Sequence, residues 1–600
     1  MPLTGSTVLW VLKDKAKKVA RHEQTRLVII AIATGIAAAL GATAFRELLG
    51  LIQWVWFGEF GDLSIETVQN LAWWQRLLVP TMGGLIVGYF IYKFVPEKRP
   101  MGVPQVMEAS ALHGANMSLR DGVRGAIANA ATLGFGGSAG REGPVVHLGA
   151  TIGAKLARLG RLPREQARVL LACGVAGAVA ASFNAPLAGV FFALEVVIGH
   201  YALAAFAPIV IASLVATIVS RQIYGEFPAF VIPDYSTSYF EFPAFALLGG
   251  AAALLAVTFM RLVPLVEQSL AKVPIGPWLR PTIGGFGVGL IALAYPEVLG
   301  VGYGATDAAL KGEMSLLLLL GLLAAKTLAT ALTLGSGFGG GVFSPSLFLG
   351  AMLGGAFGIV AGNAIPQLFD LQDNTLFAGE GAYAMVGMGA VAGAVLGAPM
   401  STILIIFELT GDYELTMGVM LSTVVASLIV TNWHGQSYFR GVLARRGVDL
   451  TTRVEHDLLE TERVDQLMSK RFSSVPLETS LVDLRLHLQT APYNELFVLD
   501  QEGRLFGTIT LADLDEAAFD HVLDDLVIAA DVARRKPPML EAGDNLQDAI
   551  TLMETVHEEH IPVVNSRYSR RLVGFVHEKD VMLAYNKALV RLHRDEGAAF

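Results

Sequence analysis

The stretch "GSAGREGPVVHLGATIG" (residues 137–153) holds two charged residues, Arg141 and Glu142, in a run that is otherwise rich in glycine and apolar side chains. A later stretch, "GSGFGGGVFSPSLFLGAMLG" (residues 335–354), shares its glycine-rich opening, its proline and its Leu-Gly-Ala spacing, but lacks the charged pair. The chain therefore uses one pattern twice, and one copy carries a titratable side chain.

A second matched pair follows in the same order. "NAPLAGVFFALE" (184–195) ends on Glu195 and "GAPMSTILIIFE" (397–408) ends on Glu408, with the same spacing from the Ala-Pro pair to the glutamate. Chance similarity between Gly/Ala-rich segments is the alternative, and two matches in one order argue against it. The sequence therefore predicts two related halves, which are typical of transport proteins with a binding site between the halves.

The apolar composition indicates a membrane protein. Of 600 residues, 53% are hydrophobic and 16% are charged, whereas soluble domains carry about 25% charged residues. A helix of about 20 mostly apolar residues spans the hydrocarbon core, and stretches near this length recur at 27–45, 77–95, 202–219, 244–260, 316–334 and 415–431. The single cysteine, Cys173, excludes an intrachain disulfide and a cysteine-rich metal site.

Basic residues predict which side of the membrane the termini face. They precede the first apolar stretch and follow the last one, at Lys13, Lys15, Lys17, Lys18, Arg21, Arg26, Arg440, Arg445 and Arg446. Because cytoplasmic flanks carry an excess of Lys and Arg, we expect cytoplasmic termini on a multi-pass protein of the cell (inner) membrane. An amphipathic helix on anionic lipid is the alternative for the first group, and it predicts the same side. The opening residues lack the basic start and cleavage site of a signal peptide.

The composition changes near Gly447, where dense charge and short alternating strands replace the apolar stretches. The soluble part also repeats, because "LFGTITLADL" (505–514) aligns with "LVGFVHEKDV" (572–581). The predicted parts are a basic arm at 1–26, a membrane domain at 27–448 with repeats at about 27–222 and 240–446, and a soluble domain at 455–590 with copies at about 462–520 and 527–586.

Three segments with glycine and proline should open new helices in the membrane part: "RPMGVPQVMEAS" (99–110) and the loops before Pro144 and Pro345. Glycine runs are poor helix formers, and proline suits a first turn. Non-helical backbone at membrane depth must be buried in protein or line a cavity. Free amides at helix N-termini attract anions without binding them too tightly for release. The pattern predicts an anion pathway, with a capped cytoplasmic loop as the alternative for the first segment.

These segments resemble the CLC family of chloride channels and proton-coupled chloride exchangers. "PMGVP", "GREGP" and "GVFSP" stand in the order of the three anion-site motifs of that family, and a C-terminal CBS pair is common in it. The resemblance implies an all-α polytopic membrane protein of two related repeats, followed by an α/β tandem CBS-domain pair. It also implies a homodimer with one pore per subunit.

The resemblance also implies a site. Glu142 matches the gating glutamate, whose carboxylate competes with the anion and swings away when protonated. An intramembrane glutamate is a functional candidate in any case, and a permanent Arg141–Glu142 salt bridge is the structural alternative. Tyr438 matches a tyrosine whose hydroxyl contacts the anion, with an interfacial anchor as its alternative, and Glu195 matches a structural glutamate. The implied anion-binding residues are Met101, Gly102, Gly140, Arg141, Gly143, Val342, Phe343 and Tyr438.

Four positions bear on mechanism. Met101 stands where a serine is frequent, and a thioether cannot donate a hydrogen bond to an anion, so anion selectivity is in question. Val196 stands where exchangers commonly carry a proton-relay glutamate, which favours passive conduction. His147 replaces a frequent glutamine near Glu142, and His200 lies one turn after Val196. Packing is the default interpretation of both histidines.

The CBS pair resembles domains that bind an adenine nucleotide such as ATP, ADP or AMP. Thr510 and Asp513 have the spacing of a ribose-binding pair, and the second copy keeps Asp580 with His577 in place of the threonine. A dimer scaffold without a ligand is the alternative.

We therefore expect chloride transport across the membrane, gated by protonation of Glu142, with channel-like conduction favoured over chloride/proton exchange. A fluoride-selective transporter is a further alternative, less favoured because "GVFSP" is intact. A CBS-containing divalent cation transporter would need clustered oxygen ligands, and the membrane part has few acidic residues. The chain shows no nucleophile–base or metal-ligand spacing, so we expect no enzyme activity, no metal, no required cofactor and no nucleic-acid partner.

Overall fold

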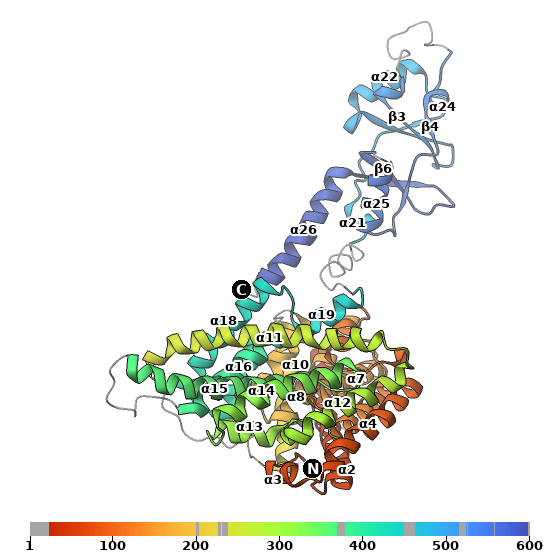
Figure 1. Ribbon diagram of the computed structural model, residues 1–600. Helices are drawn as coiled ribbons and strands as arrows, with labels where there is room; N and C mark the ends of the chain where they lie inside the picture. Colours follow the sequence, from red (N-terminus) through yellow and green to blue (C-terminus); the bar gives the residue numbers. More distant parts are fainter. Residues whose placement is uncertain are drawn as a thin grey trace, which may run out of the picture. The chain divides into compact units, whose positions relative to one another are not determined.

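The computed structural model describes residues 23–199, 203–225, 230, 238–368, 379–448, 462–514, 524, 526–556 and 558–597. The chain forms two units, Met1–Val448 and Asp449–Phe600. The first consists of helices, and the second combines two small sheets with helices (Figure 1). The predicted class, a helical membrane protein followed by an α/β pair of repeats, is confirmed.

Within the described ranges, nine helices of the first unit are long and apolar enough to cross a bilayer. They are α2 Glu23–Phe57, α4 Trp73–Phe94, α8 Arg164–Phe183, α10 Leu203–Tyr224, α11 Phe242–Ala271, α14 Leu316–Gly335, α15 Phe343–Leu368, α16 Gly379–Leu396 and α18 Tyr413–Trp433. Each of the six apolar stretches of the sequence overlaps one of these helices along nearly its whole length. The apolar pattern misses α8, α15 and α16, because these helices are mostly surrounded by protein and use Gly and Ala for close packing.

Shorter helices complete the first unit. They are α3 Ile65–Asn70, α5 Val103–Ala111, α6 Leu119–Gly134, α7 Glu142–Leu159, α9 Pro186–Phe192, α12 Arg280–Ala294, α13 Tyr303–Leu310, α17 Pro399–Thr410 and α19 Tyr438–Arg445. Helices α5, α7 and α15 begin at the three predicted glycine and proline segments. Each has a proline in its first turn, where the missing amide costs no intrahelical hydrogen bond.

The two halves pack their matched helices in the same way. Helix α7 packs on α8, and α15 packs on α16. A Cβ atom added at Gly149 would lie 2.3 Å from the carbonyl oxygen of Gly174, and one added at Gly350 would lie 2.3 Å from that of Gly387. Gly149 and Gly350 occupy equivalent places in the sequence repeat. The repeat therefore encodes one backbone-to-backbone contact used twice.

Glu195 and Glu408 make reciprocal contacts, each with the start of the other's helix, and these contacts show how the halves are oriented. The Glu408 carboxylate accepts hydrogen bonds from the amides of Leu187 and Ala188, both at 2.8 Å, at the start of α9. The Glu195 carboxylate accepts from the amide of Ser401 at 2.9 Å and from its hydroxyl at 2.5 Å, at the start of α17. Each glutamate thus lies near the end of one helix and caps the other, so α9 and α17 run antiparallel and the repeats are inverted.

The second unit contains two copies of one small fold. The first copy has a sheet of order β1-β2-β3-β4, and the second has a sheet of order β5-β6-β7. Val498 of β2 lies opposite Gly507 of β3, and Val563 of β6 lies opposite Gly574 of β7. These glycines are the pair that the sequence alignment superposes.

Each sheet packs against a helix of its own copy, α22 in the first and α25 in the second. The strands are β1 Ser474–Pro476, β2 Glu495–Leu499, β3 Leu505–Thr510, β4 Arg534–Arg535, β5 Leu540–Glu541, β6 His560–Val564 and β7 Leu572–His577. The helices are α21 Val464–Leu467, α22 Leu481–Thr490, α23 Leu511–Leu514, α24 Ala529–Val532, α25 Leu546–Val556 and α26 Glu578–Gly597.

Candidate functional site

The two glycine-rich loops meet as a short antiparallel bridge. The amide of Gly140 donates to the carbonyl of Gly341 at 2.7 Å, and the amide of Gly341 donates to the carbonyl of Gly140 at 2.8 Å. A Cβ atom at Gly140 would lie 2.9 Å from a carboxylate oxygen of Glu142 and 3.1 Å from the Gly341 oxygen. The bridge therefore needs glycine, and it places the starts of α7 and α15 next to each other.

The carboxylate of Glu142 lies at the N-terminus of α15, in the other half of the chain. Its Oε2 accepts hydrogen bonds from the Ser344 hydroxyl at 2.5 Å and the Ser344 amide at 3.3 Å. Its Oε1 accepts from the Tyr303 hydroxyl at 2.9 Å. The residue is 2% exposed. A buried carboxylate on helix amides occupies the kind of position that an anion would take.

Arg141 is held mainly by Asp62 and not by its neighbour. Its guanidinium donates to both Asp62 oxygens, at 3.0 and 3.1 Å, and lies over the Tyr303 ring at 4.7 Å from the ring centre. The distance from Arg141 Nε to Glu142 Oε1 is 3.8 Å. The salt-bridge alternative for Arg141 and Glu142 is therefore the weaker contact. Together Arg141, Asp62 and ionised Glu142 carry one net negative charge, which protonation of Glu142 would remove.

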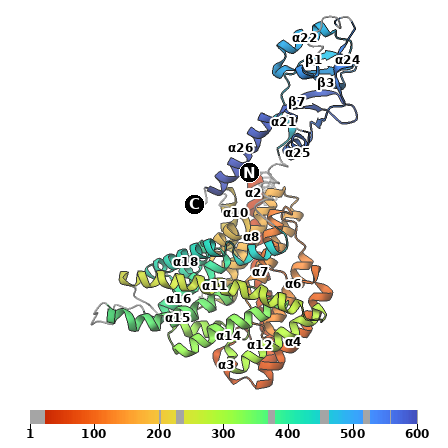
Figure 2. The ribbon, with the colours of Figure 1, turned by 45° about the horizontal axis from the view of Figure 1, so that its top comes forward.

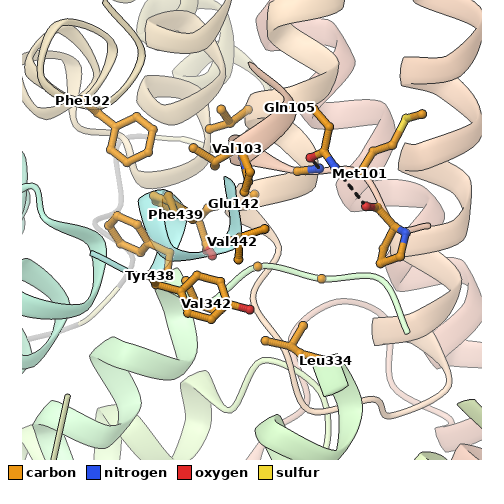
Figure 3. A pocket seen from close by; sticks show the side chains of 18 of the residues that line it. Met101, Val103, Gln105, Glu142, Phe192, Leu334, Val342, Tyr438, Phe439 and Val442 are labelled. Carbon is orange, nitrogen blue, oxygen red and sulfur yellow. Dashed lines mark hydrogen bonds between the residues drawn. The ribbon is translucent and has the colours of Figure 1, made fainter. Parts of the chain in front are cut away.

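A cavity of about 110 Å³ adjoins Glu142 (Figure 3). Its walls come from the starts of α5, α7, α15 and α19 and from aromatic side chains of α8 and α9, including Val342, Phe343, Tyr438, Phe183 and Phe192. One water needs roughly 15 Å³ of such space, so the cavity can hold a monatomic anion. Among the described residues, the amides of Val342 and Phe343 find no protein acceptor. They are free donors at the edge of the cavity.

Two of the predicted anion-binding amides are already used. The amide of Gly102 donates to Oε1 of Gln105 at 2.9 Å, which caps α5, and the amide of Gly140 belongs to the glycine bridge. Met101 lies with its sulfur near Gly125 of α6 and points away from Tyr438 (Figure 3). In this conformation the amides of Gly102 and Gly140 are not free donors, whereas Met101 and Gly102 still line the cavity. Gly143 lines the cavity.

The sequence profile described as "Voltage gated chloride channel" matches residues 83–431 of this chain, more than half of its length. The chain belongs to this family, the CLC proteins. The profile described as "CBS domain" matches twice, at 464–520 and 529–587. Membership overturns the alternative of a divalent cation transporter. The described part of the chain contains no group of three or more His, Cys, Asp or Glu side chains that could hold a metal ion.

Relatives cover most of the CLC chain. A protein of Ralstonia nicotianae described as chloride channel protein ClcB-like is 33% identical over 431 residues, covering 70% of this chain and 98% of its own. Chloride channel protein CLC-f of Arabidopsis thaliana is 30% identical over 544 residues, covering 81% and 69%. The solved structure of a slow cyanobacterial Cl⁻/H⁺ antiporter superposes with a TM-score of 0.61 at 22% identity, covering 70% and 98%. This last likeness concerns the fold alone.

Among the described residues, the remaining positions singled out in the CLC membrane part make no hydrogen bond or ion pair with Glu142. Val196 belongs to a π-helical turn, Ala193–Ile198, that continues α9, and it is buried. His147 is buried in α7 and makes no hydrogen bond or ion pair with Glu142. His200 lies outside the described residues.

Asp513 of the CBS pair has its partners within the protein. It accepts hydrogen bonds from the amide and the hydroxyl of Thr510, both at 2.7 Å, and from Arg534 at 3.1 Å. Arg534 also contacts Glu558 at 2.6 Å. A nucleotide at Thr510 and Asp513 would have to displace or share the arginine. Asp580 lies in the first turn of α26, in the other copy.

Sequence motifs do not identify Asp62, Tyr303, Ser344 or Gln105 as site residues. Ser344 lies inside "GVFSP", so this motif could have predicted a place for Ser344 beside Glu142. Tyr303 is the first residue of α13, and Gly302, directly before it, has a φ of 91°. Its contact with Glu142 depends on tertiary packing and has no local signal.

Proposed function

We propose that this CLC anion transporter moves chloride and that Glu142 is its gate, closed in this conformation. The observation that carries the proposal is the Glu142 carboxylate on the amide and hydroxyl of Ser344 at the start of α15. The free amides of Val342 and Phe343 beside it supply donors for an anion in the adjoining cavity. Helix N-termini favour negative charge without a full cation at the site.

Opening follows from the loss of one negative charge. A proton on Glu142 removes the charge that the helix terminus and the two hydroxyls stabilise, so the side chain leaves the site. The remaining Arg141 and Asp62 pair is neutral, and an anion meets no fixed negative charge. When Glu142 loses its proton again, its carboxylate competes with the anion for the Ser344 donors. Anion flux should therefore rise as the pH falls.

Channel-like conduction is the favoured form of transport, because Val196 cannot relay protons. Chloride/proton exchange is the alternative. The test is the reversal potential of the purified full chain in planar bilayers or proteoliposomes, with a chloride gradient and an opposing pH gradient. A channel should reverse at the chloride equilibrium potential at every pH gradient. A reversal potential that moves with the proton gradient would establish exchange instead.

Anion selectivity needs its own measurement, since Met101 provides no hydroxyl donor. The same recording with fluoride, bromide and nitrate distinguishes a chloride pathway from the fluoride alternative. Intact "GVFSP" and a cavity with more volume than one water needs favour chloride. Fluoride currents larger than chloride currents would reverse this assignment.

The same proposal includes a homodimer in the inner cell membrane, with N- and C-termini in the cytoplasm. The basic residues before α2 and after α18 support this orientation. We also propose that the CBS pair takes part in dimer contacts or adenine nucleotide binding. The spacing of Thr510 and Asp513 supports nucleotide binding. The ion pair between Arg534 and Asp513 supports a role in dimer contacts without a nucleotide, because it occupies the aspartate.

A further inference from the structure

A basic groove lies between the start of α6 and the second half of α7. Its volume is about 670 Å³, and it is lined by Ser118, Leu119, Arg120, Val123, Arg124, Lys155 and Arg158. Four of these seven residues are cationic. The two helices pack against each other (Figure 2), and basic residues from both line the groove. The groove is separate from the cavity beside Glu142, and the two share no lining residue.

Protein groups neutralise this charge in part. Asp121 pairs with Arg124 at 3.3 Å, and Arg158 donates to the carbonyl of Met117. Arg120 and Lys155 are exposed and have no hydrogen-bond or ion-pair partner in the described part of the chain. The N-terminus of α6 adds positive character, because no side chain caps it. The groove therefore has at least two uncompensated cations beside a helix terminus.

The wall of the groove continues into an apolar face. Val123 is 44% exposed and Ile127 is 39% exposed, and they lie one turn apart on α6. Leu159 near the end of α7 is 66% exposed. A basic pocket that adjoins exposed aliphatic side chains on membrane helices matches a ligand with a charged head and an apolar chain.

The groove lies on the side of the membrane from which α2 starts. Arg26 in the first turns of α2 donates to the carbonyl of Gly160, which ends α7. The groove and the start of α2 therefore face the same leaflet. Their charge distribution predicts the cytoplasmic leaflet, whose anionic lipids attract basic segments near the surface.

We propose that the groove between α6 and α7 binds the phosphate of an anionic phospholipid, with Arg120 and Lys155 as the principal contacts and Val123 and Ile127 against its acyl chain. The shared chemistry is a phosphate group, and free phosphate is the competing source. Lipid is favoured because the aliphatic face continues from the charged end of the groove. Binding would also clamp α6 to α7, the helix that begins with Glu142.

The test uses the purified full chain in detergent, with native mass spectrometry and thermal unfolding as readouts. Dioleoylphosphatidylglycerol is compared with dioleoylphosphatidylcholine, and inorganic phosphate is a third arm. The double variant Arg120→Gln/Lys155→Gln removes the two unpaired cations. The matched control, Lys93→Gln/Lys98→Gln, removes two exposed cations outside the groove, one in the last turn of α4 and one in the short turn that follows α4.

Wild type and the α4 control should bind phosphatidylglycerol and unfold at a higher temperature with it than with phosphatidylcholine. The groove variant should bind phosphatidylglycerol roughly 30-fold more weakly. Removing one basic residue near a lipid surface weakens binding roughly 5-fold, and the two losses multiply. If both double variants lost phosphatidylglycerol binding to the same extent, the lipid would be bound by surface charge in general and the proposed site would be wrong. A thermal shift given fully by inorganic phosphate, and lost in the groove variant, would overturn the lipid as the source. A groove variant that binds phosphatidylglycerol like wild type would overturn the site.

Discussion

The hydroxyl of Ser344 donates a 2.5 Å hydrogen bond to Oε2 of Glu142. A residue from the second half of the chain thus holds the ionisable side chain of the first half. The serine amide adds a second contact to the same oxygen at 3.3 Å. In the closed state that we propose, Glu142 is therefore held by groups that the glycine bridge between Gly140 and Gly341 brings together.

Replacing Ser344 with alanine should make the gate open at higher pH. The change removes one hydrogen bond to a charged group, which contributes about 1.5–3 kcal/mol, and about 1.4 kcal/mol corresponds to a factor of ten. Because the lost contact stabilises the ionised form, the midpoint of acid activation should rise by about one to two pH units. Chloride flux from proteoliposomes as a function of pH measures this midpoint.

The matched control for this serine is Ser269→Ala. Its hydroxyl bonds to the Leu265 carbonyl on the exposed side of α11, away from the gate. The control should keep the wild-type midpoint. If Ser344→Ala also keeps it, the serine does not hold the closed gate.

Tyr303→Phe should shift acid activation in the same direction. It removes the hydroxyl that donates to Oε1 of Glu142 at 2.9 Å and keeps the ring beneath Arg141. The tyrosine and the serine contact different carboxylate oxygens, so the double variant should open at a higher pH than either single variant. The same flux assay tests this. A double variant that matches Ser344→Ala alone would show that the tyrosine contributes nothing to closure.

Glu142→Gln should abolish the pH dependence of anion flux. Glutamine mimics the protonated carboxyl, so the helix terminus no longer holds a charged side chain and the pathway stays open at neutral pH. Flux should equal the acid-activated wild-type value between pH 4.5 and 7.5. Glu414→Gln, on the exposed first turn of α18, is the control and should remain acid-activated. Retained acid activation in Glu142→Gln would assign the gate to another group.

Motif spacing predicts the site only where its residues are close in sequence to a helix start. Glu142, Val342 and Phe343 lie within three positions of a proline that opens a helix, so pattern and position coincide. Asp62 and Tyr303 reach the same site from distant segments through packing, and no periodicity or motif links them to it.

Hydropathy identifies the membrane helices only where they face lipid. Helices that face lipid are apolar along their length and are recognised from hydropathy, as for α2 and α14. Helix α16 is nearly all enclosed by protein, and its Gly- and Ala-rich sequence serves close packing, so hydropathy alone overlooks it. The inverted arrangement of the halves depends on the contacts of Glu195 and Glu408 across them, which a linear repeat does not specify.

Gly149→Ala should destabilise the membrane unit. The new Cβ would lie 2.3 Å from the Gly174 carbonyl oxygen and 2.7 Å from Cβ of Ala178, so α7 and α8 must separate. Overpacking of this kind costs about 1–3 kcal/mol and should lower the midpoint of thermal unfolding in detergent. Gly250→Ala in α11 is the control, because its Cβ meets nothing within 4 Å. It should raise stability by up to about 1 kcal/mol through helix propensity. Equal unfolding midpoints for the two variants would contradict the close approach of α7 and α8 at Gly149.

Glu408→Gln should destabilise the pairing of α9 with α17 and leave the acid activation of flux unchanged. Its carboxylate accepts from two amides at the start of α9, and a neutral amide side chain offers one oxygen and no charge to the same positive helix end. We expect a loss of about 1–3 kcal/mol in thermal unfolding. Glu195→Gln should cost a similar amount, since its carboxylate makes the equivalent contacts at Met400 and Ser401. A variant that unfolds like wild type, or one with a shifted activation midpoint, would show that the reciprocal caps are not the structural device inferred from their geometry.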